Sequence, residues 1–376
     1  MLGIKTNLDE VRESHTETIE PINMEWVGGE GPDAKKRYES FDNVLKKYLF
    51  SDQAMPLVAS LRSIFLSLFL QAVLAVASAQ AGATETCALP QQEVLRLGCT
   101  AACWSAENQT LVEALSATAE AEGYALELVR MSSAADLKKL DGFISPGGHD
   151  IDPSFYNSQV SPKNKRKLAQ LHRLTGNQDE AQLKKLGRLQ EAKQLRKERS
   201  ERDRLEHKII KSYLENSEHA ELPFLGVCYG MQMLGAASGI PLYVDLQKQL
   251  GIPARREADT IRLQPGHALQ SYLELKANSL NVPKNHHQAL DLNFIRRRKN
   301  FTRNIKVTAT SNQGKIPEII ELKNRPALGV QFHAEESAFD ETKSAPFKWL
   351  LEKACQKKVR SLQRSTSKTQ ATQNSQ

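Results

Sequence analysis

Residues 225–232 form the run Leu225-Gly226-Val227-Cys228-Tyr229-Gly230-Met231-Gln232, which places one thiol in a turn flanked by glycines. The apolar residues before Cys228 predict a short buried strand, and the residues after it predict the start of a helix. A sharp turn from strand to helix favours negative charge, because free N–H groups at a helix N-terminus point toward it. Gly230 lets the backbone pass closely. This pattern predicts a nucleophilic thiol at Cys228.

A second apolar run, at residues 327–332, ends at His333, and Glu335 follows two residues later. A thiol with an ordinary pKa of about 8.5 is mostly protonated at neutral pH and needs a nearby base. His333 can take that proton and return it to a leaving amine, while Glu335 holds the imidazole tautomer. We interpret Cys228, His333 and Glu335 as a triad for thiol-based acyl transfer. The alternative is a buried strand-end cysteine and a satisfied core histidine.

Three further motifs accompany the triad. They are Asp141-Gly-Phe-Ile-Ser-Pro-Gly147-Gly148-His-Asp150-Ile-Asp152-Pro153, Arg202-Asp203-Arg-Leu-Glu206 and Asn285-His286-His287-Gln288-Ala289-Leu290. With Cys-x-Gly-x-Gln and His-x-Glu they make five motifs over roughly residues 92–355. In this order the motifs resemble those of the class I glutamine amidotransferase-like superfamily. Within it they resemble the gamma-glutamyl hydrolase branch, which includes the gamma-glutamyl-GABA hydrolases.

The resemblance implies a fold and a set of roles. The implied fold is an α/β three-layer sandwich with a mostly parallel central sheet, of the flavodoxin-like kind. The implied catalytic residues are Cys228, His333 and Glu335. The implied oxyanion hole consists of Gly147, Gly148 and the backbone amide of Tyr229. The implied substrate-binding residues are Gln232, His286, His287 and Gln288.

Two residues depart from the family pattern. Tyr229 stands where the family usually has arginine, and Ala334 stands where it usually has proline. The oxyanion donor at position 229 is a backbone group, and Ala334 only loosens a turn, so the catalytic assignment stands. A changed side chain beside the nucleophile can alter the choice of substrate. Of His286 and His287 we expect one to face the pocket; the alternative is that both lie in a surface loop.

The surrounding pattern also favours an α/β fold. Residues 93–98, 124–129 and 142–145 predict strands, and residues 108–121 predict a helix with apolar residues on one face. Strands that alternate with helices imply a mostly parallel sheet covered on both faces. In such sheets ligands bind beyond the carboxyl ends of the strands, where the catalytic segments are all predicted to lie.

The basic excess of the chain lies in one segment. The 376 residues are 40% hydrophobic and carry a formal net charge of +7, which is enough apolar material for a full core. Residues 161–204 hold 14 Lys and Arg against 6 Asp and Glu, and the remainder holds 37 against 38. We predict a charged helical insertion at residues 158–200. Three functional interpretations are a lid over the pocket, a contact for an acidic surface and a nucleic-acid site. The interpretation we favour is a solvated, partly helical segment without a function of its own. It has no Phe, Tyr or Trp to stack on bases, so we expect no nucleic-acid partner.

The N-terminal region resembles a targeting segment. Residues 1–54 are polar and mixed in charge, whereas residues 56–81 are mostly apolar and end in small residues typical of a cleavage site. If translation begins at Met55, residues 55–81 resemble a secretory signal peptide. Read from Met1, the segment is an internal signal or a single membrane anchor, and a buried helix is the remaining alternative. We favour export to the periplasm or the medium; otherwise the protein is membrane-anchored or cytoplasmic.

Other features bound the domain. Residues 90–356 make up the predicted hydrolase domain, and the polar tail at residues 357–376 is predicted to be disordered. Cys99 and Cys103 are close enough to pair in an oxidising compartment, or they are free thiols. No Cys/His spacing predicts a metal site and no glycine-rich loop predicts a phosphate site, so we expect no metal and no cofactor.

The predicted activity is cleavage of γ-glutamyl amide bonds through a glutamyl-thioester on Cys228. The substrate is a small molecule or a short peptide. Two alternatives stay open. One is a glutaminase subunit that delivers ammonia to a separate synthetase, and the other is a non-catalytic binding protein on the same scaffold. A homodimer and membrane anchoring through residues 56–81 also stay open.

Overall fold

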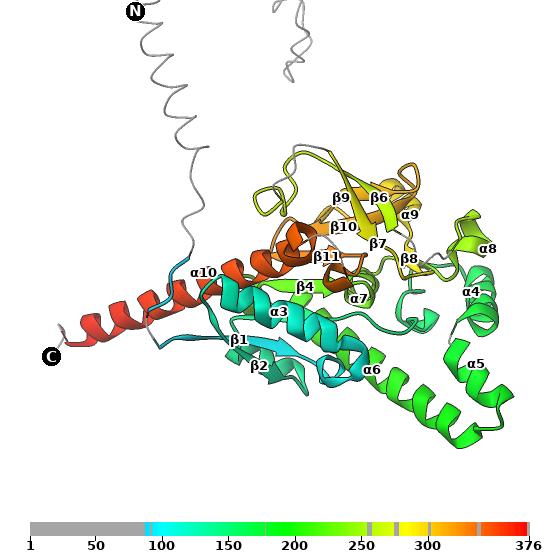
Figure 1. Cartoon of the computed structure of the whole chain (residues 1–376), viewed down its shortest axis with the longest axis horizontal. Coiled ribbons are helices and arrows are strands. Elements are labelled where there is room, and N and C mark those ends of the chain that lie inside the picture. Colours follow the sequence, from blue (N-terminus) through cyan, green and yellow to red (C-terminus); the bar gives the residue numbers. More distant parts are fainter. Residues whose placement is uncertain are drawn as a thin grey trace, which may run out of the picture. The chain divides into compact units, whose positions relative to one another are not determined.

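The computed structural model describes residues 87–90, 92–176, 178–253, 258–273, 278–299, 302–336 and 340–373 (Figure 1). The chain divides into two units, Met1–Ala83 and Thr84–Gln376. The predictions for residues 1–54 and 55–81 therefore fall outside the described residues. Within the described ranges, no helix has the length and apolar character needed to cross a membrane.

The core of the second unit is a mixed sheet. Its strand order is β2-β1-β3-β4-β11-β10-β9-β6-β7 among the described residues. The strands are β1 (Val94–Cys99), β2 (Ala125–Arg130), β3 (Gly142–Ser145), β4 (Phe224–Val227), β6 (Ala258–Leu263), β7 (Ser279–Pro283), β9 (Ile305–Ser311), β10 (Ile316–Leu322) and β11 (Ala327–Val330). The first five strands in this order, β2, β1, β3, β4 and β11, pair in parallel with their neighbours. The other four, β10, β9, β6 and β7, pair antiparallel, and β10 also pairs antiparallel with β11. The predicted α/β fold is confirmed, and the antiparallel extension adds to it.

Helices cover both faces of this sheet, which gives three layers (Figure 1). The helices are α3 (Gln109–Ala121), α4 (Pro162–Thr175), α5 (Gln178–Lys185), α6 (Leu189–Glu215), α7 (Tyr229–Ala237), α8 (Leu246–Leu250), α9 (Leu292–Arg297) and α10 (Asp340–Gln373). The first apolar cluster contains Leu111 of α3 and Phe347 of α10. The second contains Tyr213 of α6 and Leu234 of α7. Strands buried on both faces read as continuous apolar runs, which explains why β3, β4 and β11 were visible in the sequence.

Short elements complete the unit. A two-stranded sheet pairs β5 (Leu242–Tyr243) with β8 (Ala289–Leu290). The 3₁₀ turns are η1 (Ala101–Trp104), η2 (Ala106–Asn108), η3 (Ala134–Lys139), η4 (Pro153–Phe155), η5 (Ser217–His219) and η6 (Ala334–Glu336). The η6 turn follows β11 directly and contains Glu335, so it sets the position of that carboxylate relative to His333.

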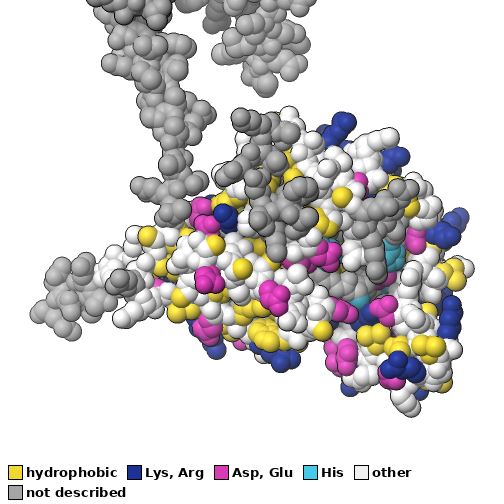
Figure 2. Space-filling view, in the orientation of Figure 1, with side chains coloured by type: hydrophobic (Ala, Val, Ile, Leu, Met, Phe, Trp, Pro, Cys, Tyr) yellow, Lys and Arg dark blue, Asp and Glu magenta, His cyan; other side chains and the backbone are white. Residues whose placement is uncertain are grey.

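The charged segment at residues 158–200 is helical and packs on itself. It comprises α4, α5 and the first half of α6, with α5 folded back against α6. Glu180 of α5 is buried and pairs with Lys184 and with Arg196 of α6. Of the apolar side chains in this segment, Leu186 and Leu189 are exposed, whereas Ala192 is buried. Figure 2 shows Lys and Arg side chains along the edge that these helices form.

The prediction of a disordered tail was wrong for residues 357–373. They continue α10, whose buried part packs against α3. The reason is polar docking that composition does not reveal. Lys357 donates to the carbonyl of Leu140 at 2.7 Å, and Lys358 donates to the carbonyl of Val94 at 2.7 Å. Together these contacts order the start of the tail although it is poor in apolar residues.

Two disulfides form among the described cysteines. One joins Cys99 to Cys103, a pairing that the sequence left open. The other joins Cys87 to Cys355, which are 268 residues apart, and ties the start of the domain to α10. Cys228 stays a free, buried thiol, so the cysteine with predicted chemistry is the one left unpaired.

Candidate active site

Cys228 sits at a strained turn between β4 and α7. Its backbone has φ 47° and ψ −99°, a region that non-glycine residues rarely occupy. The Cys228 N–H donates to the carbonyl of Val330 in β11 at 2.7 Å, which fixes the turn against the neighbouring strand. The turn also needs its glycines: a Cβ on Gly226 would lie 2.5 Å from the carbonyl carbon of Gly230. A Cβ on Gly230 would lie 2.0 Å from the carbonyl oxygen of Ser145.

The predicted base and acid converge on this thiol from the end of β11. His333 Nδ1 lies 2.8 Å from a carboxylate oxygen of Glu335, and the His333 ring hydrogen-bonds with Cys228. Gln331 donates from Nε2 to the Cys228 sulfur at 3.6 Å. The ring also lies against the glycine loop, because a Cβ on Gly147 would be 2.7 Å from His333 Cε1. The three sequence-predicted catalytic residues therefore meet in one place.

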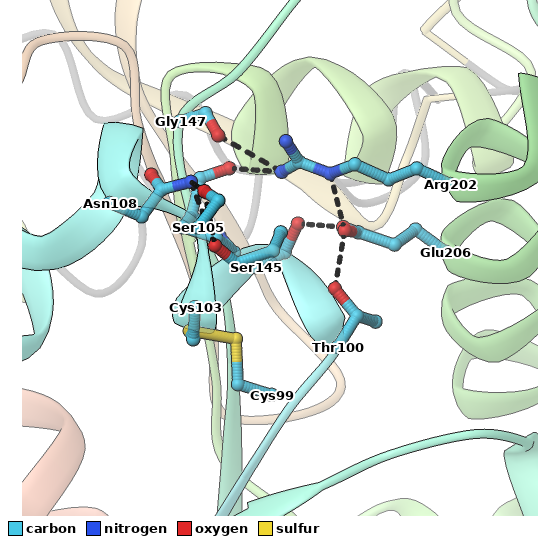
Figure 3. Close-up of a disulfide and its surroundings, with 11 residues drawn as sticks. Cys99, Thr100, Cys103, Ser105, Asn108, Ser145, Gly147, Arg202 and Glu206 are labelled. Atoms are coloured by element: carbon cyan, nitrogen blue, oxygen red, sulfur yellow. Dashed lines mark hydrogen bonds and ion pairs between the residues drawn. A yellow bond between two sulfur atoms is a disulfide. The ribbon is translucent and has the colours of Figure 1, made fainter. Parts of the chain in front are cut away.

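The Gly147–Gly148 loop is held by an arginine of α6, as Figure 3 shows. Arg202 Nη2 donates to the carbonyls of Pro146 and Gly147, each at 3.0 Å. A Cβ on Gly148 would lie 2.2 Å from Arg202 Nη1, so only glycine fits beneath the guanidinium. These donors fix the loop backbone through its carbonyl groups.

Behind Arg202 lies a buried carboxylate. Arg202 Nε donates to Glu206 at 2.8 Å, one helical turn away. Glu206 also accepts from Thr100 at 2.7 Å and from Ser145 (Figure 3). Sequence analysis identified the Arg-Asp-x-x-Glu motif without assigning it a role. The i,i+4 spacing of opposite charges was the available signal, but its partners come from β3 and the end of β1.

Two residues predicted to bind substrate form hydrogen bonds to backbone groups. Gln232 Nε2 donates to the carbonyl of Gln288 at 3.0 Å and lies 3.3 Å from the side-chain oxygen of Gln331. The side-chain oxygen of Gln288 accepts from the N–H of Ile151 at 3.0 Å. Both glutamines are buried. They connect the nucleophile helix to the loops that carry the histidines and the glycines.

The two neighbouring histidines differ in environment. His286 is buried, its Nδ1 lies 2.9 Å from the carbonyl of Gln288, and burial lowers its pKa to about 3. His287 reaches solvent and its Nε2 lies 2.8 Å from Asp150. Burial opposes charging of His287, but Asp150 and then Asp245 outweigh it and raise the pKa. His287 is therefore the histidine that can contact a substrate, and His286 is a neutral core residue.

Metal binding has no support in the described part of the chain. No group of three or more His, Cys, Asp or Glu side chains there is arranged to hold a metal ion.

Comparison with known proteins shows what the chain is similar to. The Peptidase C26 family matches residues 173–335, a span that includes Cys228, His333 and Glu335. A glutamine amidotransferase-like protein of Lactococcus lactis, YvdE, is 32% identical over 138 residues, which cover 36% of this chain and 53% of the relative. A Mycobacterium tuberculosis protein named as a glutamine amidotransferase, Rv2859c, is 27% identical over 208 residues. These residues cover 54% of this chain and 53% of the relative. These matches support the resemblance of this chain to the class I glutamine amidotransferase-like superfamily.

The chain matches only about half the length of these two curated relatives. Among solved structures, the glutaminase domain of Trypanosoma brucei CTPS with bound acivicin aligns with a TM-score of 0.46 at 11% identity. That alignment covers 70% of this chain and 93% of that domain.

The departure at position 229 is built into the structure. The Tyr229 hydroxyl donates to Asp203 at 2.8 Å, and the guanidinium of Arg202 lies 4.1 Å from the centre of its ring. Burial, followed by the charges of Asp203 and Glu206, raises the pKa of Tyr229 well above its ordinary value. The side chain therefore points toward α6 as a neutral donor, while its backbone amide stays at the start of α7.

The electrostatics of the triad favour a protonated base. Burial alone would lower the pKa of His333, but attraction by the Cys228 sulfur and hydrogen bonds to Cys228 and Glu335 raise it to about 11. His333 therefore holds a proton at neutral pH, which it can transfer to a leaving nitrogen.

This predicts a specific effect of Glu335→Gln on the pH profile. Removing the carboxylate removes one of the interactions that favour the charged ring, so the pKa of His333 falls. Since the protonated ring is needed as the acid, we expect the alkaline limb of kcat/KM, near pH 11 in the wild type, to move to lower pH. At neutral pH we expect kcat/KM to fall by about 10²-fold or more.

The measurement is kcat/KM from pH 6 to 11. Glu336→Gln is the control, because Glu336 is exposed on the same turn; an unmoved limb in Glu335→Gln would contradict the assigned role.

Proposed function

We propose that this protein is a cysteine hydrolase that cleaves γ-glutamyl amide bonds. The observation that carries the proposal is the free thiol of Cys228 on a positive-φ turn, in hydrogen-bond contact with a His333–Glu335 pair. The match to the Peptidase C26 family supports hydrolysis by a thiol. The γ-glutamyl specificity is our inference from the motifs of the catalytic loops.

The first half-reaction forms a thioester. The sulfur of Cys228 attacks the γ-carbonyl carbon of the substrate, and the electron pair of the C=O bond moves to oxygen. The amide of Tyr229 and the amides of the Gly147–Gly148 turn donate to that oxyanion. When the intermediate collapses, the C–N bond breaks and His333 gives its proton to the leaving nitrogen. An amine or peptide fragment departs, and the glutamyl group stays on sulfur.

The second half-reaction restores the thiol. Water gives a proton to His333 and attacks the thioester carbonyl, which forms a second oxyanion in the same hole. The C–S bond then breaks, glutamate leaves, and Cys228 is ready for another turn. Glu335 keeps the imidazole oriented through both steps. Every proton moves between groups of this chain, substrate and water.

A second candidate function is supply of ammonia to a separate synthetase. It is favoured by the names of the two relatives, which are described as glutamine amidotransferase and glutamine amidotransferase-like. In that case glutamine would be the substrate, and the chain would need a partner that accepts the ammonia.

A substrate panel tests the proposal. The full-length chain is assayed on glutamine, γ-glutamyl-GABA, a γ-glutamyl dipeptide and polyglutamylated folate. Hydrolysis of the larger γ-glutamyl amides without any partner supports the stand-alone hydrolase. Turnover of glutamine alone, stimulated by a co-purifying synthetase, supports the second function instead. A folded protein that turns over nothing, with Cys228 inert to an alkylating glutamine analogue, would leave only the binding scaffold.

A further inference from the structure

A cavity of about 760 Å³ lies between the loop after Gly148 and the charged insertion. One wall consists of the loop residues from His149 to Phe155, and the other walls come from α4, α5 and α6. We call it the insertion pocket. The helices that build it sit together at one end of the domain in Figure 1. The insertion therefore does more than add a solvated excursion, because it encloses a space beside a catalytic loop.

The insertion pocket adjoins the catalytic residues through Asp203. This carboxylate lines the pocket, accepts from the Tyr229 hydroxyl at 2.8 Å and lies 3.0 Å from His149 Nε2. Asp150 also lines the pocket and pairs with His287. Tyr229, the residue after the nucleophile, and His287 therefore each contact a side chain that lines the insertion pocket.

The charged side chains that line the pocket leave a formal excess of one positive charge. They are five cations, Arg173, Lys184, Arg196, Arg199 and Arg204, and four carboxylates, Asp150, Asp152, Glu180 and Asp203. Glu180 pairs with both Lys184 and Arg196. Arg173 and Arg204 line the same pocket and form no ion pair within the described ranges. Their guanidinium groups have the fork geometry that carboxylates bind best.

A buried histidine gives an independent sign of a missing partner. His172 lines the pocket, is 7% exposed, and its Nε2 has no hydrogen-bond partner among the described residues. The ring edge packs against Gly176, where a Cβ would lie 2.9 Å from Nε2. A buried polar atom without a partner is costly. A ligand that enters the pocket could supply the missing hydrogen bond.

We infer that the insertion pocket binds a carboxylate, held by Arg173 and Arg204 at its rim and by His172 in its wall. We also infer that this carboxylate belongs to the amine-side fragment of the substrate, so that the insertion selects acidic leaving groups. This second part rests on the proposed function, whereas the binding of a carboxylate does not.

The binding part is tested without turnover. The full-length Cys228→Ala protein is titrated calorimetrically with glycylglycine and with its uncharged C-terminal amide. We expect the acid to bind at least about tenfold more tightly than the amide, as for a hydrogen bond to a charged group. Arg173→Gln and Arg204→Gln should each remove that preference. Arg166→Gln, an exposed position on the same helix α4, should keep it.

The selectivity part is tested by kinetics in the protein with Cys228 intact. γ-Glutamylglycylglycine is compared with its C-terminal amide, and glutamine serves as the substrate without a leaving-group carboxylate. We expect kcat/KM to favour the acid about tenfold or more, and the pocket variants to lose this ratio without slowing glutamine. If the ratio of kcat/KM for the acid to kcat/KM for the amide were the same in the wild type and in the pocket variants, the inference that the insertion selects acidic leaving groups would be overturned.

The outcomes separate the two inferences. Tight, arginine-dependent binding of glycylglycine in a protein that hydrolyses nothing would keep the pocket and reject the proposed function. Binding that is equal in Arg173→Gln, Arg204→Gln and Arg166→Gln would reject the pocket whatever the enzyme hydrolyses. His172→Leu guards against misfolded arginine variants. We expect it to weaken binding of the acid while thermal stability holds or rises, because a buried unpaired nitrogen is removed.

Discussion

Replacing Cys228 with alanine is expected to abolish hydrolysis of every γ-glutamyl substrate, with a loss of at least about 10⁴-fold in kcat/KM. The sulfur is the atom that forms the thioester, and among the described cysteines the other four are in disulfides. No second thiol can therefore replace it. The measurement is steady-state hydrolysis of the best substrate of the panel.

The backbone of Cys228 makes a second result expected from the same position. Alanine keeps a Cβ at φ 47°, so Cys228→Ala retains the strain of the turn, whereas glycine tolerates that conformation. We expect Cys228→Gly to be more stable than Cys228→Ala by about 1–3 kcal/mol, with both inactive. Thermal and denaturant unfolding provide the comparison.

A matched control separates loss of the thiol from damage to the core. Met233→Leu changes a buried side chain on the same helix at nearly constant volume, so activity should stay close to wild type. Residual activity of Cys228→Ala within a few-fold of wild type would contradict thiol catalysis. Equal stability of the alanine and glycine variants would contradict the strained turn.

The sequence predicted the elements whose causes are local. The run around Cys228 shows its strand, turn and helix because a doubly buried parallel strand is continuously apolar and because glycines mark close backbone approach. His333 and Glu335 were predicted for the same reason, since they follow the buried strand β11. In an α/β sheet the carboxyl ends of neighbouring parallel strands meet, so the pairing of β11 with β4 brings them to the thiol.

Other parts depend on contacts that the sequence does not display. The half-exposed strand β6 carries a weaker pattern than β4, so the antiparallel side of the sheet was not predicted. The substrate contacts predicted for Gln232 and Gln288 stay predictions, but the sequence did not show that both side chains also find backbone partners in distant segments. The pairing of Cys87 with Cys355 follows from the docking of α10, which a polar tail does not predict.

The second large effect is expected from Gly230→Ala, which adds a single methyl group to α7. That Cβ would lie 2.0 Å from the carbonyl oxygen of Ser145, an atom of strand β3 that cannot rotate away as a side chain could. Overpacking of a rigid interior contact costs about 1–3 kcal/mol of stability and sometimes more. We expect Gly230→Ala to lower the free energy of unfolding by about 3 kcal/mol or more. Chemical denaturation measures it directly.

The same methyl group should also impair catalysis, because β3 leads straight into the Gly147–Gly148 loop. Relief of the clash requires β3 and α7 to separate, which moves the loop away from Cys228. A displacement of about 1 Å costs on the order of 10²-fold in rate, so kcat/KM should fall at least that far in the fraction that folds.

Gly123→Ala is the control. Gly123 has φ 76° and open space around it, so strain of about 1 kcal/mol and normal activity are expected. If Gly230→Ala behaved like Gly123→Ala in both measurements, the close approach of α7 to β3 would not exist in solution, and the oxyanion loop would have to be positioned by Arg202 alone.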